Sequence, residues 1–245
     1  MTEAGPSPAS PEAGLKLMTA VLSLIAGSMD AIGFLGLGGL FTAHITGNLV
    51  ILAAHVAAGG TAQAAPMLSV PVFMAALLLA RLLAGILEKM GRNSLRPLLL
   101  LQLLSLAGCL AVCGTLGSGF DANGATATLA GMTAVCALGI QNALVQVSLH
   151  GVPATAVVTT NLARFTTDIG TILLGEGPDT VAQARRRADR LWPSIAGFVV
   201  GCSIGAVCEA RYGLVAVAAP AGLALIALAM AWASPFRQST DPRDR

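Results

Sequence analysis

The sequence predicts an all-α, polytopic integral membrane protein built from two copies of one unit. Of the 245 residues, 55% are hydrophobic and 11% are charged, and the mean hydropathy is +0.78. Soluble domains carry about 25% charged residues. The apolar residues gather in runs of the length that crosses a bilayer, about 20 residues. Polar, helix-starting stretches interrupt these runs at equivalent places in the two halves.

The two polar stretches can be aligned with one another. A shift of about 113 residues lays TAHITGN over TAVVTTN. It matches three pairs of polar residues: Thr42 with Thr155, Thr46 with Thr159, and Asn48 with Asn161. With one residue of gap, AGSMDA then aligns with LGIQNA, so that Asp30 meets Asn142. We therefore predict a first repeat over residues 15–116 and a second over residues 125–234.

Hydropathy divides the chain into eight segments. They cover residues 15–35, 43–58, 67–87, 97–116, 125–149, 154–174, 192–208 and 214–233. Glycines at 36, 38 and 39, and His150, Gly151 and Pro153, break the chain before the second and sixth segments. We predict that RRRADR (185–190) lies in a charged loop. Residues 1–14 are expected to form a disordered tail, and residues 235–245 a polar one.

The positive charges favour one of two topologies. If the second and sixth segments enter the membrane and return to the same side, eleven of the fourteen basic residues face the cytoplasm. Arg211 alone then faces outside, and Arg81 and Arg164 lie within segments. Six full spans and two broken or re-entrant helices result, and the second copy is inverted, as in many secondary transporters. A chain that crosses eight times remains the alternative, because the second segment is long for a half-crossing.

Irregular backbone at membrane depth is tolerated where it is buried in protein or lines a wet cavity. The polar residues at the two breaks are therefore candidate ligand-binding residues: Asp30, Thr42, Thr46, Asn48, Gln141, Asn142, Thr155, Thr159 and Asn161. Helix N-termini suit anions and polar groups. Candidates for proton or charge coupling are His55, Arg164 and Asp168, and the last two are spaced for an i,i+4 ion pair. Helix capping and a purely structural ion pair are the competing interpretations.

Other chemistry is not indicated. The five cysteines lie in apolar stretches without metal-ligand spacing, so we expect no metal and no cofactor. No hydrolase or nucleotide-binding signature is present, and the basic residues form no patch, so we expect neither an enzyme nor a nucleic-acid partner. Arg81 needs an acidic partner, for which Asp30 and Glu209 are available. Glycines at 197, 201 and 205 predict close helix packing, within the protomer or in a homo-oligomer.

Residues 28–52, SMDAIGFLGLGGLFTAHITGNLVIL, resemble the YoaK family of uncharacterised bacterial membrane proteins. The shared features are an aspartate near the end of the first span, here Asp30, a glycine-containing break, and the T-G-N triplet at 46–48. The second half is also similar, although Thr160 stands where family members often have glycine. The resemblance covers about residues 14–233. It implies an inner-membrane protein of about six spans and implies no substrate.

The leading functional hypothesis is a small-solute transporter that binds a polar or anionic ligand between the two breaks, near the bilayer midplane. We expect it in a bacterial inner membrane, with both termini in the cytoplasm. The alternative is a structural or regulatory membrane protein whose polar breaks only cap and pack helices. A membrane enzyme acting on a lipid or quinone is the weakest hypothesis, because no catalytic pair is evident.

Overall fold

The computed structural model describes residues 11–60, 63–117, 119–149, 152–156 and 158–233, and these form helices and no strands. The elements are α1 (Pro11–Gly36), α2 (Ile45–Ala57), α3 (Ala64–Lys89), α4 (Leu95–Cys113), α5 (Ala125–Ser148), α6 (Val158–Leu174), α7 (Pro178–Tyr212), η1 (Gly213–Val217) and α8 (Ala218–Ala233). The predicted all-α class is confirmed.

Five stretches of the described residues are long and apolar enough to cross a membrane. They are Glu12–Gly36, Ala64–Lys89, Leu95–Cys113, Ala125–Ser148 and Pro178–Ala233. The last is 56 residues long and contains α7, η1 and α8. The chain is a multi-pass membrane protein.

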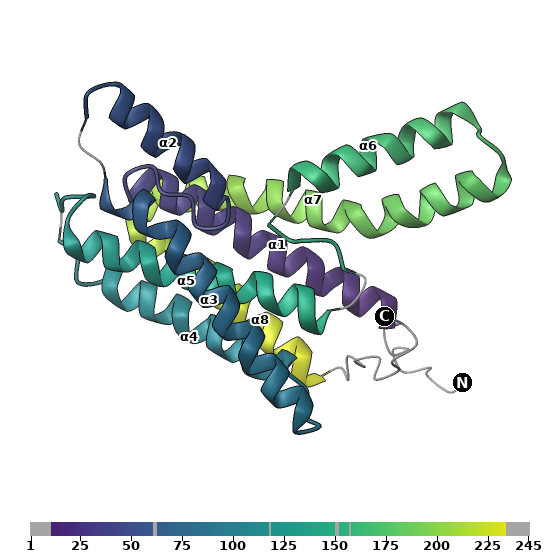
Figure 1. The fold of residues 1–245 in the computed structure, drawn as a ribbon, viewed down its shortest axis with the longest axis horizontal. Helices are drawn as coiled ribbons and strands as arrows, with labels where there is room; N and C mark the ends of the chain where they lie inside the picture. The colour runs from purple at the N-terminus through teal and green to yellow at the C-terminus, as the bar shows by residue number, and fades with distance from the viewer. Residues whose placement is uncertain (1–10, 61–62, 118, 150–151, 157, 234–245) are drawn as a thin grey trace, which may run out of the picture.

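The long helices lie side by side as a bundle, and the packing repeats between the halves (Figure 1). α1 packs along α7, and α5 packs along α3. In the same way α8 lies beside α1, and α4 lies beside α5. Figure 1 shows α1 and α5 running in opposite directions, and α3 and α7 likewise. Each half therefore packs its first helix against the third helix of the other half.

Two short helices, α2 and α6, lie on one side of this bundle and diverge from each other (Figure 1). After α1 the chain turns at Gly38 and Gly39, whose φ angles of 67° and 82° favour glycine. α2 then runs toward the end of the bundle at which α1 ends. α6 runs toward the opposite end, at which α1 begins.

Glycines bring α1 and α7 into backbone contact. A Cβ added at Gly201 would lie 2.4 Å from the Leu24 carbonyl oxygen, and one added at Gly27 would lie 2.2 Å from that of Phe198. Gly197 and Gly205 are equally close to the α1 backbone. The small residues predicted to mediate helix packing therefore do so within the protomer.

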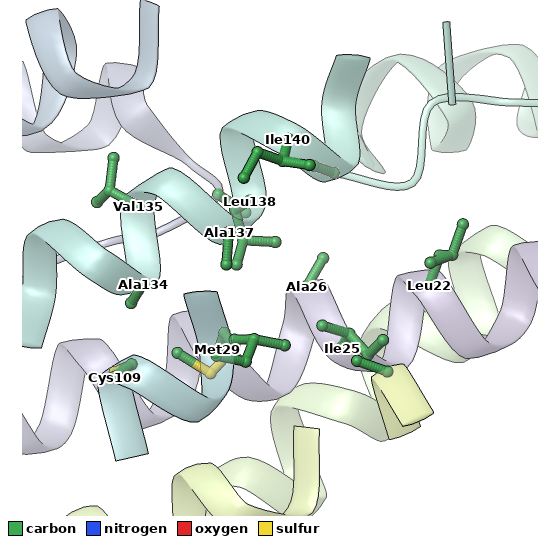
Figure 2. Close-up of a cluster of buried hydrophobic side chains, with 14 of the residues drawn as sticks. Leu22, Ile25, Ala26, Met29, Cys109, Ala134, Val135, Ala137, Leu138 and Ile140 are labelled. Carbon is green, nitrogen blue, oxygen red and sulfur yellow. The ribbon is translucent and has the colours of Figure 1, made fainter. Parts of the chain in front are cut away.

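The core lies between α1, α4, α5 and α8. Figure 2 shows part of it, and five of its fully buried side chains are Ile25, Met29, Cys109, Ala134 and Leu138. Large apolar side chains on the outer face of α3, such as Met74 and Leu79, are instead 64% and 65% exposed. This distribution suits a bundle whose outer surface meets lipid chains.

The structure corrects two sequence-based boundaries. Residues 185–190, predicted as a loop, are part of α7, which runs for 35 residues from Pro178. Alanine and arginine favour helix, and no glycine lies between Pro178 and Gly197. α1 begins at Pro11, so residues 11–14 belong to a helix and not to the N-terminal tail. Residues 1–10 and 234–245 lie outside the described residues.

Candidate functional site

The first break is organised by Asp30, which is 3% exposed near the end of α1. Its Oδ1 accepts hydrogen bonds from the Thr42 backbone N–H at 2.7 Å, the Thr42 hydroxyl at 3.1 Å and the Ala43 N–H at 2.6 Å. Its Oδ2 lies 2.5 Å from His44 Nδ1. The carboxylate thus accepts hydrogen bonds from the extended segment that leads into α2. An unpaired N–H at this buried place would cost free energy.

His44 connects this break to the second half of the chain. Its ring is half-buried and packs edge-on against Phe198 of α7, with ring centroids 5.2 Å apart. Phe41 lies on another side, at a centroid distance of 6.2 Å. His44 was not among the candidate site residues predicted from the sequence. Its pairing with Asp30 depends on the turn between α1 and α2.

In the second break, Gln141 of α5 performs the anchoring role. Its Nε2 donates to the Thr155 hydroxyl at 3.0 Å and to the Leu22 carbonyl of α1 at 2.9 Å. Its Oε1 accepts a 2.7 Å hydrogen bond from Gln102 of α4. Asn142, which the sequence aligns with Asp30, donates to the Leu138 carbonyl within its own helix. The counterpart of the Asp30–Thr42 contact is therefore Gln141–Thr155.

An asparagine holds each short helix in the same way. Asn48 Nδ2 donates to the Phe41 carbonyl at 2.7 Å and to the Ser69 hydroxyl at 2.9 Å. Asn161 Nδ2 donates to the Ala154 carbonyl at 2.7 Å and to the Ser194 hydroxyl at 3.2 Å. Both asparagines are buried, and each bond spans the same seven residues to a carbonyl. We call this arrangement the asparagine clasp.

The clasp serines, Ser69 and Ser194, were not predicted. They lie 21 and 33 residues after their asparagines, so one shift of the sequence does not align them together with the breaks. Gln102 was also missed. It lies among leucines in an apolar run. Its Oε1 is the one buried side-chain oxygen or nitrogen without a hydrogen-bond partner among the described residues.

The predicted ion pair between Arg164 and Asp168 is wrong. The Asp168 carboxylate is bound by Arg187 of α7, through Nε at 2.9 Å and Nη2 at 2.6 Å. Arg164 is exposed, and no salt bridge among the described residues includes it. Arg187 belongs to the long first half of α7, which the sequence analysis took for a loop. Arg81 is likewise exposed and unpaired with Asp30 or Glu209 in the described part of the chain.

A pocket of about 820 Å³ lies between the second break, α6 and the start of α7. Val152, Pro153 and Leu191 give it apolar walls. Its charged lining residues are Arg164, Asp168, Arg187 and Arg190. Asn161, Thr160 and Thr167 complete its polar lining. Of the residues predicted from the sequence, this pocket brings together Asn161, Arg164 and Asp168.

Both breaks lie within the residues that match one family model. A family model described as "Protein of unknown function (DUF1275)" matches residues 18–230. The chain belongs to the DUF1275 family. This membership confirms the resemblance to the YoaK family, which is the same family of membrane proteins. None of the curated proteins or solved structures compared with the DUF1275 chain matches it.

The remaining predicted residues of this DUF1275 protein lie apart from these groups. Thr46 and Thr159 are exposed on the first turns of α2 and α6. His55 is half-buried in the last turn of α2, close to Gly60. No group of three or more potential metal ligands occurs in the part of the chain that the structure describes. His150 and Gly151, predicted to break the second half, lie outside the described residues.

Proposed function

We propose that this DUF1275 protein is a small-solute transporter of a bacterial inner membrane and not an enzyme. The observation that carries the proposal is the asparagine clasp, which recurs around the short helix of each of two antiparallel halves. Oppositely oriented halves with broken helices are a layout common in transporters, where substrates bind between the halves near the midplane.

The geometry supports six crossings with two re-entrant helices. The 56-residue stretch that ends the bundle is long enough for two crossings, by α7 and by α8. α2 has 13 residues and α6 has 17, which as helices extend about 20 Å and about 25 Å and fall short of a hydrocarbon core of about 30 Å. η1 and α8 together cover residues 213–233, which is the length of a full crossing. Each half then crosses three times, and the second copy is inverted.

The charges support a cytoplasmic location for one end of the bundle. α1 begins and α3 ends toward the same end, which is also the end toward which α6 runs (Figure 1). Lys16, Lys89, Arg92 and the arginines at the start of α7 belong to this end. Arg211 belongs to the opposite end, where α7 finishes. By the positive-inside rule the basic end faces the cytoplasm, and we propose the same compartment for both termini.

The solute would bind where polar groups remain available. At the first break, Asp30 and Thr42 bind each other, and Asn48 is occupied by the clasp. These groups hold the backbone in position. The pocket at the second break has a volume of about 820 Å³ and is lined by Arg164 and Arg190, which have no salt-bridge partner among the described residues. We therefore assign the solute to this pocket.

The polar groups of the first break are already hydrogen-bonded to one another. This favours a second candidate function, a structural or regulatory membrane protein that transports no solute. Asp30 already makes four contacts with Thr42, Ala43 and His44, as a purely architectural cap would. This candidate predicts that substitutions at the breaks change stability or assembly, including any homo-oligomer, while no solute crosses.

The two candidates are separated by an osmotic assay on proteoliposomes. Stopped-flow light scattering follows vesicle volume after a jump into chloride, nitrate, acetate, phosphate or sulfate salts, with an ionophore carrying the potassium. Transport predicts faster volume recovery than in protein-free vesicles for at least one anion, and loss of that rate when Asn48→Leu and Asn161→Leu are combined. Recovery equal to that of empty vesicles for all five anions would support the structural role.

A further inference from the structure

The pocket beside the second break has no chemical counterpart in the first half. A shift of 113 residues relates Arg164 to Ile51 and Thr167 to Ala54. The pocket also depends on the length of α7. Ser194 lies 16 residues after the start of α7 at Pro178, whereas Ser69 lies 5 residues after the start of α3 at Ala64. The second half therefore has a charged surface that the first half lacks at the aligned positions.

The charges of this pocket do not balance. Three of its lining residues are arginines, and one is an acid. Asp168 is 4% exposed and accepts both hydrogen bonds from Arg187, so these two groups neutralise each other. Arg164 and Arg190 have no salt-bridge partner among the described residues. The nearest acid along the chain, Asp189, is instead paired with Lys16 of α1.

We propose that this pocket is a binding site for an oxyanion, a phosphate or carboxylate group held by Arg164 and Arg190. Guanidinium groups bind such anions through paired, charge-assisted hydrogen bonds. The hydroxyl of Thr160 adds a donor, since it lines the pocket and is exposed to it. Val152 and Leu191 add apolar walls beside these donors.

The Asp168–Arg187 pair lies in the wall of the pocket, between the two arginines that have no acidic partner in the described chain. It joins α6 to α7 and fixes one guanidinium at the wall, while the two uncompensated arginines approach from different helices. The anion belongs either to a dissolved solute or to the headgroup of an anionic lipid. The chemistry of recognition is the same for both sources, and the experiment distinguishes them. If the anion is a transported solute, the pocket is the substrate site of the proposed transporter, and this part of the inference rests on the proposed function. Binding of the anion does not depend on transport.

The test measures binding of inorganic phosphate to the full chain in nanodiscs of zwitterionic phosphatidylcholine. Trp232→Phe leaves Trp192 as the single tryptophan, next to the lining residue Leu191. Phosphate is titrated against chloride at constant ionic strength, and the binding is followed by Trp192 fluorescence and by calorimetry. We expect saturable binding that Arg164→Gln and Arg190→Gln each weaken at least about tenfold, as loss of a charge-assisted hydrogen bond implies.

Two further variants make the result specific. Arg92→Gln removes an exposed arginine from the turn after α3, far along the chain from the pocket, and should leave the phosphate affinity unchanged. Arg164→Lys keeps the charge and should recover part of the lost affinity. Equal weakening by Arg92→Gln and Arg164→Gln would overturn the proposal, because it would indicate non-specific attraction.

Nanodiscs that contain phosphatidylglycerol identify the source of the anion. A dissolved solute predicts the same phosphate titration in both kinds of disc. A lipid headgroup predicts that phosphatidylglycerol itself shifts the Trp192 signal, that phosphate then has no effect, and that Arg164→Gln abolishes the shift. If neither phosphate nor phosphatidylglycerol gives a fluorescence change or heat, the site does not exist. Saturable binding without anion flux in vesicles would keep this inference and overturn the transport function.

Discussion

The two halves of the protein hold the same backbone break with different chemistry. The clasp is common to both, because Asn48 and Asn161 each bind a carbonyl seven residues earlier and a serine of the next helix. The anchors differ. In the first half a buried carboxylate, Asp30, gathers the donors of the break. In the second half an amide, Gln141, links the break to α1 and α4.

This difference indicates that the two breaks have different roles. At the first break the Asp30 carboxylate is bound by Thr42, Ala43 and His44 of its own half, and the His44 ring packs against Phe198. The second break borders the arginine-lined pocket, and its anchor reaches other helices through neutral hydrogen bonds. We infer that the first half fixes the architecture and that the second half carries the ligand chemistry.

Loss of the carboxylate should have the largest effect. Asp30→Ala leaves the N–H groups of Thr42 and Ala43 without acceptors in a buried site, at about 1–3 kcal/mol for each group. We expect a large fall in the midpoint of thermal unfolding in detergent, measured by fluorescence-detected size exclusion. Asn142→Ala is the matched control at the aligned position, and it should cost little because its amide bonds only within α5. Equal stability of the two variants would contradict the assigned role of Asp30.

Loss of the clasp asparagine should destabilise both halves. Asn48→Leu and Asn161→Leu each remove a buried amide of similar volume and leave a carbonyl and a serine with fewer partners. Asn48→Leu also removes the acceptor of the Phe41 N–H, which donates to Asn48 Oδ1 at 2.8 Å. Each should lower the free energy of unfolding by about 1–3 kcal/mol. The exposed Thr46→Val is the control. If one asparagine variant is destabilised and the other is as stable as the control, the clasp is not a property of the repeat.

Substitution by alanine of the two aligned glycines at the helix crossings, Gly27 and Gly139, should lower the stability by different amounts. A Cβ at Gly27 would lie 2.2 Å from the Phe198 carbonyl oxygen, whereas one at Gly139 would lie 3.0 Å from that of Phe73. We therefore expect Gly27→Ala to cost about 1–3 kcal/mol through overpacking, and Gly139→Ala to cost less. Thermal unfolding of the two variants measures this. Gly222→Ala serves as the control, because its Cβ would meet no atom within 4 Å.

The smallest effect on stability is expected at the pocket. Asp168→Asn weakens the pair with Arg187, whose side chain is 53% exposed, so the loss should not exceed about 1 kcal/mol. The same change removes the only acid among the charged lining residues, and phosphate should therefore bind more tightly in the calorimetric titration. A weaker affinity for phosphate would indicate that Asp168 orients the arginines in a way that its charge does not explain.

The sequence predicted those features that depend on apolar length and local pattern. Residues 125–149 were expected as one helix, and α5 covers Ala125–Ser148, because Gly124 precedes the run and polar residues follow it. The alignment of Asn48 with Asn161 also led to two residues with matching contacts. These inferences need only the period of a helix and a comparison of the chain with itself.

Features that depend on helix rotation and on distant contacts were not predicted. Gln141 and Asn142 are adjacent, but one residue turns a helix by about 100°, so only one of them faces the break. Asp168 was assigned to its neighbour Arg164, because i,i+4 spacing is visible in a sequence and a partner 19 residues away on another helix is not. The charged start of α7 was taken for a loop, because hydropathy detects lipid-facing surface and not helicity.

The central claim, two inverted halves with re-entrant short helices, is tested most directly by cysteine accessibility. In a background without the five native cysteines, single cysteines replace Ala58 at the end of α2 and Asn93 between α3 and α4, both of which are exposed. Intact cells are treated with a membrane-impermeant maleimide. If α2 is re-entrant, the cysteine at position 58 is labelled and the cysteine at position 93 is protected until the cells are opened. Labelling at 93 with protection at 58 would mean that α2 crosses the membrane, and the inverted arrangement would be wrong.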